Sequence, residues 1–231
     1  CKPDGLILEY RVNKKQPIPS CGLFLLLSCY FYFSCLRTDS YCSFIQSIPC
    51  ASPSSLKGNI SEILAAAELP YHGTGIDAGS QDAVSVENQA WYCETARHLA
   101  KHLNCTVMAT GKKDLIADAE NAFLVSNGHA ALSGVTGTGC MVGALTAAYL
   151  PGSKAIFTKS GIFETSSIIP DKTKVSYGTA AALLAAVAMG ISGELAAEIS
   201  KGPGSFQTAL LDEVYAMTDE TLLEKARLQE F

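Results

Sequence analysis

The chain has 231 residues, of which 48% are hydrophobic and 17% are charged, and its formal net charge is −5. This composition can bury a continuous core and argues against an intrinsically disordered chain. The slight acidity, without any run of Lys or Arg, disfavours nucleic acid and anionic membranes as partners, although backbone amides can still bind phosphates.

Residues 1–55 differ in composition from the rest of the chain. They hold six of the nine cysteines and an aromatic run over 21–36. This run is shorter than the roughly twenty residues of a spanning helix, and the cysteine spacings match neither a zinc site nor a disulfide framework. Three interpretations are open: a membrane anchor, a pair of core strands, or a non-native stretch, and we favour the third. We therefore predict an atypical Cys- and aromatic-rich segment over 1–55 and a second unit over 56–231.

Regular patterns begin after the Ser/Pro-rich seam near residue 55. A helix is predicted over 59–69, with Asn59 or Ser61 as its cap, and it is followed by a Gly-rich loop over 71–80. A second helix is predicted over 86–103. Its buried stripe at i, i+3, i+4 and i+7 comprises Ala96, Leu99, Ala100 and Leu103.

A buried strand over 105–110 and a hairpin with strands over 115–117 and 122–125 come next. A helix of small residues is expected to start after Cys140 and to run through Tyr149, where Pro151 and Gly152 end it. This order of helix, strand and hairpin predicts an α/β sheet with helices on its faces.

Two more helices are predicted near the C-terminus. The first spans 177–199 and is only mildly broken by Gly190 and Gly193. The Gly202–Gly204 turn stops it, and Ser205 caps a last amphipathic helix that runs through Met217.

The clearest chemical signal is Val135-Thr-Gly-Thr-Gly-Cys-Met-Val142, in which two glycines alternate with threonines before a helix. Such a turn aims successive N–H groups at one point, and the helix dipole adds positive potential there. We predict an anion hole for a transferring phosphoryl group, with Thr138 and Gly139 contacting the nucleotide. Cys140 at the helix start is a candidate to accept or orient the proton of an attacking alcohol. The alternative is an ordinary glycine turn with a structural cysteine.

The segment Leu56-Lys-Gly-Asn-Ile-Ser-Glu-Ile63 is the second candidate. Asn59 and Glu62 are three residues apart at a helix start, so both side chains can face one pocket. The Glu62 carboxylate could hold Mg²⁺ through water, and Lys57 could contact a phosphate. A simple helix cap formed by Asn59 and Glu62 explains the same spacing.

The end of the strand over 105–110 is the third candidate. Thr110 and Gly111 could contact nucleotide phosphate through a hydroxyl and an amide, and a plain strand-ending turn is the alternative. Asp114 is interpreted as a solvated turn residue and His129 as a turn or lid residue, and both are left out of the site.

Six segments in this order resemble the hydroxyethylthiazole kinase family of the ribokinase-like superfamily. They cover about residues 56–217. In chain order they read Lys-Gly-Asn-Ile-Ser-Glu-Ile, Thr-Gly-Lys-Lys-Asp, Ser-Asn-Gly-His, Val-Thr-Gly-Thr-Gly-Cys, Gly-Ile-Ser-Gly-Glu-Leu-Ala and Gly-Pro-Gly-Ser-Phe. The resemblance implies ATP- and Mg²⁺-dependent phosphorylation of 4-methyl-5-(2-hydroxyethyl)thiazole in thiamine biosynthesis.

The resemblance also assigns roles to single residues. Thr110 would contact ATP phosphate, Gly137 would lie beside the thiazole, and Glu62 would help to hold Mg²⁺. Lys57 stands where the family usually has an ATP-contacting Arg, so it keeps the charge and loses the bidentate fork. Cys140 occupies the position of a catalytic Asp in the wider superfamily.

The fold implied by the resemblance is a ribokinase-like three-layer α/β sandwich whose N-terminal half is missing or replaced here. It further implies a homotrimer with sites between subunits. The cytoplasmic location is expected from the three later cysteines, which sit singly in apolar or Gly-rich settings, as in a reducing cytosol. Two alternatives are kept: a kinase of hydroxymethylpyrimidine, which has a similar Gly-Thr-Gly-Cys turn, and a truncated remnant that binds nucleotide without turnover.

Overall fold

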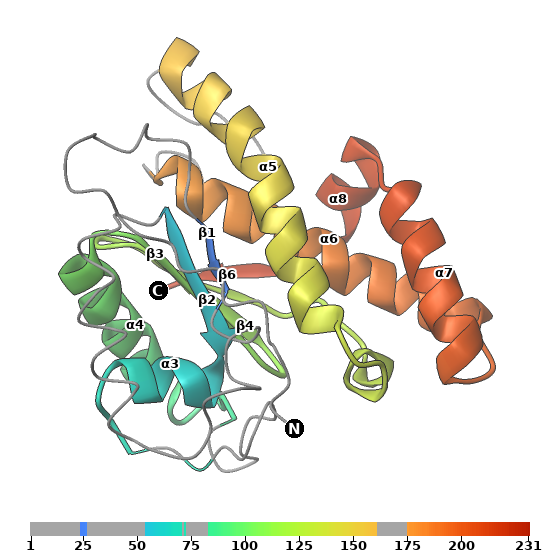
Figure 1. Ribbon diagram of the computed structural model, residues 1–231, viewed down its shortest axis with the longest axis horizontal. Helices are drawn as coiled ribbons and strands as arrows, with labels where there is room; N and C mark the ends of the chain where they lie inside the picture. Colours follow the sequence, from blue (N-terminus) through green and yellow to red (C-terminus); the bar gives the residue numbers. More distant parts are fainter. Residues whose placement is uncertain (1–23, 27–53, 71, 73–82, 161–174) are drawn as a thin grey trace, which may run out of the picture.

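A computed structural model describes residues 24–26, 54–70, 72, 83–160 and 175–231 (Figure 1). Most of the segment over 1–55, and the loop predicted over 71–80 apart from His72, lie outside the described residues.

The described strands form one six-stranded sheet in which spatial order follows sequence order. From the first strand to the third, neighbouring strands pair in parallel. From the third strand to the sixth, neighbouring strands pair antiparallel. The strands are β1 (Phe24–Leu26), β2 (Ser55–Asn59), β3 (Thr106–Thr110), β4 (Asp114–Ala117), β5 (Ala122–Val125) and β6 (Leu228–Glu230).

Helices cover both faces of this sheet. The helices are α3 (Ile60–Ala66), α4 (Gln89–Leu103), the 3-10 helix η3 (Ala130–Gly134), α5 (Thr138–Ser160), α6 (Tyr177–Ile199), α7 (Pro203–Tyr215) and α8 (Asp219–Lys225). Figure 1 shows α3 and α4 on one side of the strands and α5 and α6 on the other, with α7 and α8 outside α6.

The alternation of side chains along the strands explains the three layers. On β3, Val107 and Ala109 belong to an apolar cluster with α3 and α4, whereas Met108 belongs to a second cluster with α5, α6 and α7. On β4, Leu115 and Ile116 divide between the clusters in the same way. Because successive residues of a strand face opposite sides, each sheet face has its own core. The predicted three-layer α/β sandwich is therefore confirmed.

Several elements follow the sequence prediction closely. Asn59 caps α3, and all four residues of the predicted stripe on α4 are buried. β4 and β5 form the predicted hairpin, and α6 has the predicted bounds. The prediction missed β2, because Ser, Lys, Gly and Asn in a five-residue strand give no apolar pattern.

Pro151 does not end α5. The helix continues through it to Ser160. Proline has a helical φ and removes one backbone hydrogen bond, and the buried residues Leu150 and Ser153 on either side of it keep the helix packed.

The prediction for the C-terminal region needs two corrections. Ser205 lies within α7, where its Oγ accepts from the N–H groups of Lys201 (3.0 Å) and Gly202 (3.2 Å), so Gly202 is the capping position. The helix after Gly204 is also not the last element, because α8 and β6 follow it. β6 completes the sheet beside β5, a pairing that three residues of local sequence could not predict.

Among the described residues, one helix is long and apolar enough to be tested as a membrane span. This is α6, and 78% of its apolar window is buried within the protein, as in the core helix of a sandwich.

Candidate active site

Three chain segments meet at one corner of the sheet. The parallel strands β2 and β3 end side by side, with Asn59 opposite Thr110. β4 starts at the same edge with Asp114, since the antiparallel register pairs Ala109 with Leu115. In open α/β sheets the carboxyl edge of the parallel strands is the usual place for ligands.

Strand alternation determines which side chains at this corner face α5. Lys57 pairs with Met108, which packs toward α5 and α6, whereas Leu56 belongs to the opposite core. Thr110 and Asp114 are each two residues from a side chain of the α5–α6 core, Met108 and Ile116 respectively. Lys57, Thr110 and Asp114 therefore share one face of the sheet.

Lys57 is the unusual residue of the corner, because its side chain is only 2% exposed. Its Nζ lies 3.1 Å from the point where a Cβ on Gly139 would stand. The ammonium group thus touches the first turn of α5, and the missing side chain of Gly139 makes room for it. A buried ammonium requires anionic partners, and its charge acts on the carboxyl groups of Glu62 and Asp114, where it opposes the rise in pKa that burial causes.

Glu62 forms the helix cap that was considered for it from the sequence. Its Oε2 accepts from the Asn59 N–H at 2.7 Å, and Asn59 Oδ1 accepts from the Glu62 N–H at 2.8 Å, which is a capping box. Its Oε1 is buried without a hydrogen-bond partner. Burial raises the pKa of Glu62, and the bond from Asn59 and the charge of Lys57 oppose this rise. Oε1 therefore has capacity left for a hydrated cation.

The turn between β3 and β4 has a defined hydrogen-bond pattern. Thr110 Oγ1 donates to the carbonyl of Gly58 at 3.2 Å, and the Gly111 N–H donates to Asp114 Oδ1 at 3.0 Å. Burial raises the pKa of Asp114 to about 6, against the lowering by the Gly111 N–H and by Lys57. Asp114 is thus half-buried and is bonded within the turn, as a turn residue that is not freely solvated.

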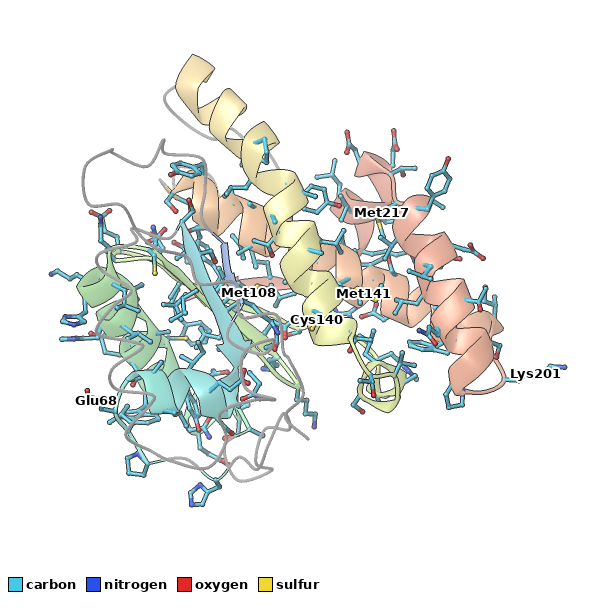
Figure 2. All side chains as sticks on the ribbon, viewed as in Figure 1. Glu68, Met108, Cys140, Met141, Lys201 and Met217 are labelled. Carbon is cyan, nitrogen blue, oxygen red and sulfur yellow. The ribbon has the colours of Figure 1, made fainter. Side chains whose placement is uncertain are left out.

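The glycine turn before α5 is open on its outer side. Gly137 has a φ of +99°, a conformation that side chains rarely adopt, and no atom lies within 4 Å of the point where its Cβ would stand. The Thr138 hydroxyl donates to the carbonyls of Leu132 and Val135, which fixes the turn on the preceding segment. Figure 2 shows Cys140 at the amino-terminal end of α5, where it is half-buried. The first N–H groups of a helix have no intrahelical partner, so this end is suited to an anion.

Two glycines on α6 support the segment that leads into this turn. A Cβ on Gly190 would lie 2.6–2.8 Å from atoms of Asn127, and one on Gly193 would lie 2.8 Å from Leu132. They do not break α6, which continues past both. Their role is close packing of the loop between β5 and α5. His129 caps η3 through its Nδ1 in this loop, as a turn residue.

Two other features lie away from the corner. Figure 2 places Lys201, which precedes the Gly202–Gly204 turn, far from Cys140. A groove of about 520 Å³ lies between the end of α3 and α4, lined by Leu69, Trp91 and His98 among others. It is on the opposite face of the sheet from Lys57, and its described lining residues include neither a buried charge nor a glycine turn.

The structure brings together most of the residues predicted from the sequence. Lys57 and Gly139 are in contact range, and the capped Glu62 carboxylate is near enough to interact with Lys57. Thr110 lies at the same edge. Among the described residues, no group of three or more metal-ligating side chains occurs. The sequence reasoning left Asp114 out of this corner, and its spacing of three from Gly111 after a strand was the available signal for its place there.

Comparison with known proteins gives one consistent result. The model of the hydroxyethylthiazole kinase family matches residues 34–220. A hydroxyethylthiazole kinase of Clostridium botulinum (strain Eklund 17B) is 37% identical over 175 residues, which cover 75% of this chain and 54% of that protein. Hydroxyethylthiazole kinase 2 of the Kyoto strain is 30% identical over 230 residues, 100% of this chain and 75% of that protein.

A solved structure agrees with these relatives. The hydroxyethylthiazole kinase protein of Pyrococcus horikoshii OT3 superposes with a TM-score of 0.57 at 28% identity, covering 86% of this chain and 61% of that one. The chain thus spans between about half and three quarters of the proteins it matches. The family match starts before residue 56, within the segment over 1–55, and the division of the chain at that point stays a prediction.

Proposed function

Since the chain belongs to the hydroxyethylthiazole kinase family, we propose that it transfers the γ-phosphoryl group of ATP to the hydroxyl of 4-methyl-5-(2-hydroxyethyl)thiazole. The observation that carries this proposal is the approach of the buried Lys57 ammonium to Gly139 in the first turn of α5. There a buried positive charge approaches the amino-terminal end of a helix, whose dipole favours an anion.

Phosphoryl transfer requires mainly positioning and charge stabilisation. Lys57 would bind the phosphate as a point charge, and the amides of Thr138 and Gly139 would donate to its oxygens. Thr110, at the same edge, would contact the nucleotide, as the family resemblance implies. The Gly111 amide would need to exchange its bond to Asp114 before it could contact phosphate.

Cys140 would act on the acceptor alcohol. It lies in the first turn of α5, which begins at Thr138, and Gly137 offers open space nearby for the thiazole. In this role the thiol would orient the attacking hydroxyl, or its thiolate form would accept the hydroxyl proton and become the thiol. Cys140→Ala should then lower kcat by about 10²-fold with little change in the affinity for ATP, the effect expected for a general base.

Glu62 fits the Mg²⁺ that such a transfer needs. Its buried Oε1 would be satisfied by a water ligand of the ion, and Oε2 would keep the cap on Asn59. The ion would neutralise phosphate charge. Glu62→Gln should raise the Mg²⁺ concentration required for half-maximal activity, and an unaltered metal titration would remove this role.

The proposal includes a cytoplasmic location, where ATP is available, and a homotrimer as implied by the family. It also retains the expectation that neither nucleic acid nor membrane is a partner, which rests on the charge distribution. Size-exclusion chromatography with light scattering measures the assembly state directly.

The direct test is a kinase assay on the full chain with ATP, Mg²⁺ and the thiazole alcohol, followed by detection of thiazole phosphate. The hydroxymethylpyrimidine alcohol is run in parallel. Product from the pyrimidine alone would assign the rival kinase activity. ATP binding without product from either alcohol would identify a nucleotide-binding remnant.

A further inference from the structure

Asp114 is a polar residue of the corner to which neither the family comparison nor the mechanism above gives a role. It opens β4, and the sheet register brings it to the edge where Thr110 ends β3. It also shares the face of the sheet that carries Lys57, two strands away, because Lys57, Met108 and Ile116 form one row across β2, β3 and β4.

The backbone holds the Asp114 carboxylate in place. Its Oδ1 accepts from the Gly111 N–H at 3.0 Å, across the three-residue turn that joins β3 to β4. A carboxylate fixed in this way has a defined position, so it can fix a partner in turn.

The partner that the sheet offers is Lys57. It lies on the same face as Asp114, two strands away, and the charge of its ammonium group opposes the rise in the pKa of the Asp114 and Glu62 carboxyl groups that burial causes. Each carboxylate is held by a backbone N–H, of Gly111 and of Asn59 respectively. If Glu62 also serves a cation through Oε1, Asp114 is the carboxylate left to hold Lys57.

We propose that Asp114 is a positioning residue, whose negative charge holds the Lys57 ammonium against the Gly137–Cys140 turn where the phosphate binds. This inference rests on the proposed function. Without Asp114 the flexible four-carbon side chain of Lys57 would adopt several conformations. Its ammonium group would then contact the phosphate in only some of them. The effect should therefore appear in ATP recognition and leave the thiazole alcohol unaffected.

The test uses Asp114→Asn in the full-length chain. Asparagine keeps an oxygen that can accept from Gly111, so the turn is retained while the charge is removed. Steady-state kinetics should show a KM for ATP about tenfold higher, the size of one lost charge-assisted contact, with an unchanged KM for the alcohol. Asp212→Asn, on the exposed surface of α7, is the matched control and should behave as wild type.

A double-mutant cycle distinguishes positioning from a purely structural role. In a Lys57→Met background, Asp114→Asn should change ATP recognition less than about twofold, because the residue through which it acts is absent. An equal effect in both backgrounds, or a single variant within twofold of wild type, would overturn the proposal.

Calorimetric binding of ATP with Mg²⁺ separates failure of this inference from failure of the proposed function. If the wild-type chain binds ATP but forms no thiazole phosphate, the kinase function fails. The double-mutant cycle of Asp114→Asn and Lys57→Met is then measured on the dissociation constant for ATP, which still tests the positioning role. If the wild-type chain binds no ATP, both are overturned.

Discussion

Replacing Gly190 by Ala tests how α6 positions the loop before the glycine turn. A Cβ at this position would stand 2.6 Å from Asn127 Cβ and 2.7 Å from its carbonyl carbon. Ordinary carbon contacts lie at about 3.5–4.0 Å, so the loop must move by roughly 1 Å. Asn127 cannot move freely, because its side chain donates to the Lys225 carbonyl at 2.9 Å and accepts from the Arg227 N–H at 2.7 Å.

The expected change in the free energy of unfolding is the sum of two costs and one gain. Overpacking costs about 1–3 kcal/mol, strained hydrogen bonds cost on the order of 1 kcal/mol, and alanine in a helix interior gains about 1 kcal/mol. We expect Gly190→Ala to lower the free energy of unfolding by about 2 kcal/mol, which is about 4–8 °C in Tm for a chain of this size.

Differential scanning calorimetry provides the measurement, with Gly204→Ala as control. Gly204 is in the first turn of α7, and no atom lies within 4 Å of the place of its Cβ, so that variant should be at least as stable as wild type. A Gly190→Ala protein as stable as the Gly204→Ala protein would refute the close packing of α6 on Asn127.

Three further predictions concern single residues. Glu68 follows the C-cap of α3 and has a φ of 59°, so Glu68→Gly should relieve strain and raise stability by about 0.5–1 kcal/mol in urea unfolding, and a less stable variant would contradict this. Burial raises the pKa of Cys93 to about 11 and that of Cys105 to about 12, so both thiols should resist iodoacetamide at pH 8 in the native protein and react after denaturation. Peptide mass spectrometry measures the alkylation of each cysteine, and rapid labelling of Cys93 or Cys105 in the native protein would contradict this prediction. The pKa of Asp114, raised to about 6 from 3.8, means that the folded state binds its proton more tightly than the unfolded state. Relative to Asp114→Asn, the wild type should lose on the order of 1–3 kcal/mol as pH rises from about 4 to 6, and then no more; a parallel pH profile for the two proteins would disprove this shift.

The sequence predicted those parts of the fold that local patterns encode. The stripe on α4 and the apolar strands β3 to β5 follow directly from periodicity, and the cap at Asn59 follows from its spacing to Glu62. β2 and β6 were missed because the sheet itself stabilises them: one carries a buried lysine and the other has three polar or partly exposed residues. Pro151 misled the prediction because tertiary packing overrides a single lost hydrogen bond.

The same distinction applies to the candidate site. The glycine turn and Lys57 could be selected from the sequence, because their chemistry is local or implied by a family pattern. The contribution of Asp114 depends on which side chains share a sheet face with it, and this needs the register of three strands. The roles given to single residues at this corner stay predictions until binding and turnover are measured.

The most direct test of the central claim is calorimetric titration of ATP with Mg²⁺ into the wild-type chain and into Lys57→Met, both checked for folding by circular dichroism. If phosphate is bound where the Lys57 ammonium approaches Gly139, the wild type should bind ATP and the variant should bind it at least about tenfold more weakly. Equal affinities in two folded proteins would contradict a phosphate site at this corner.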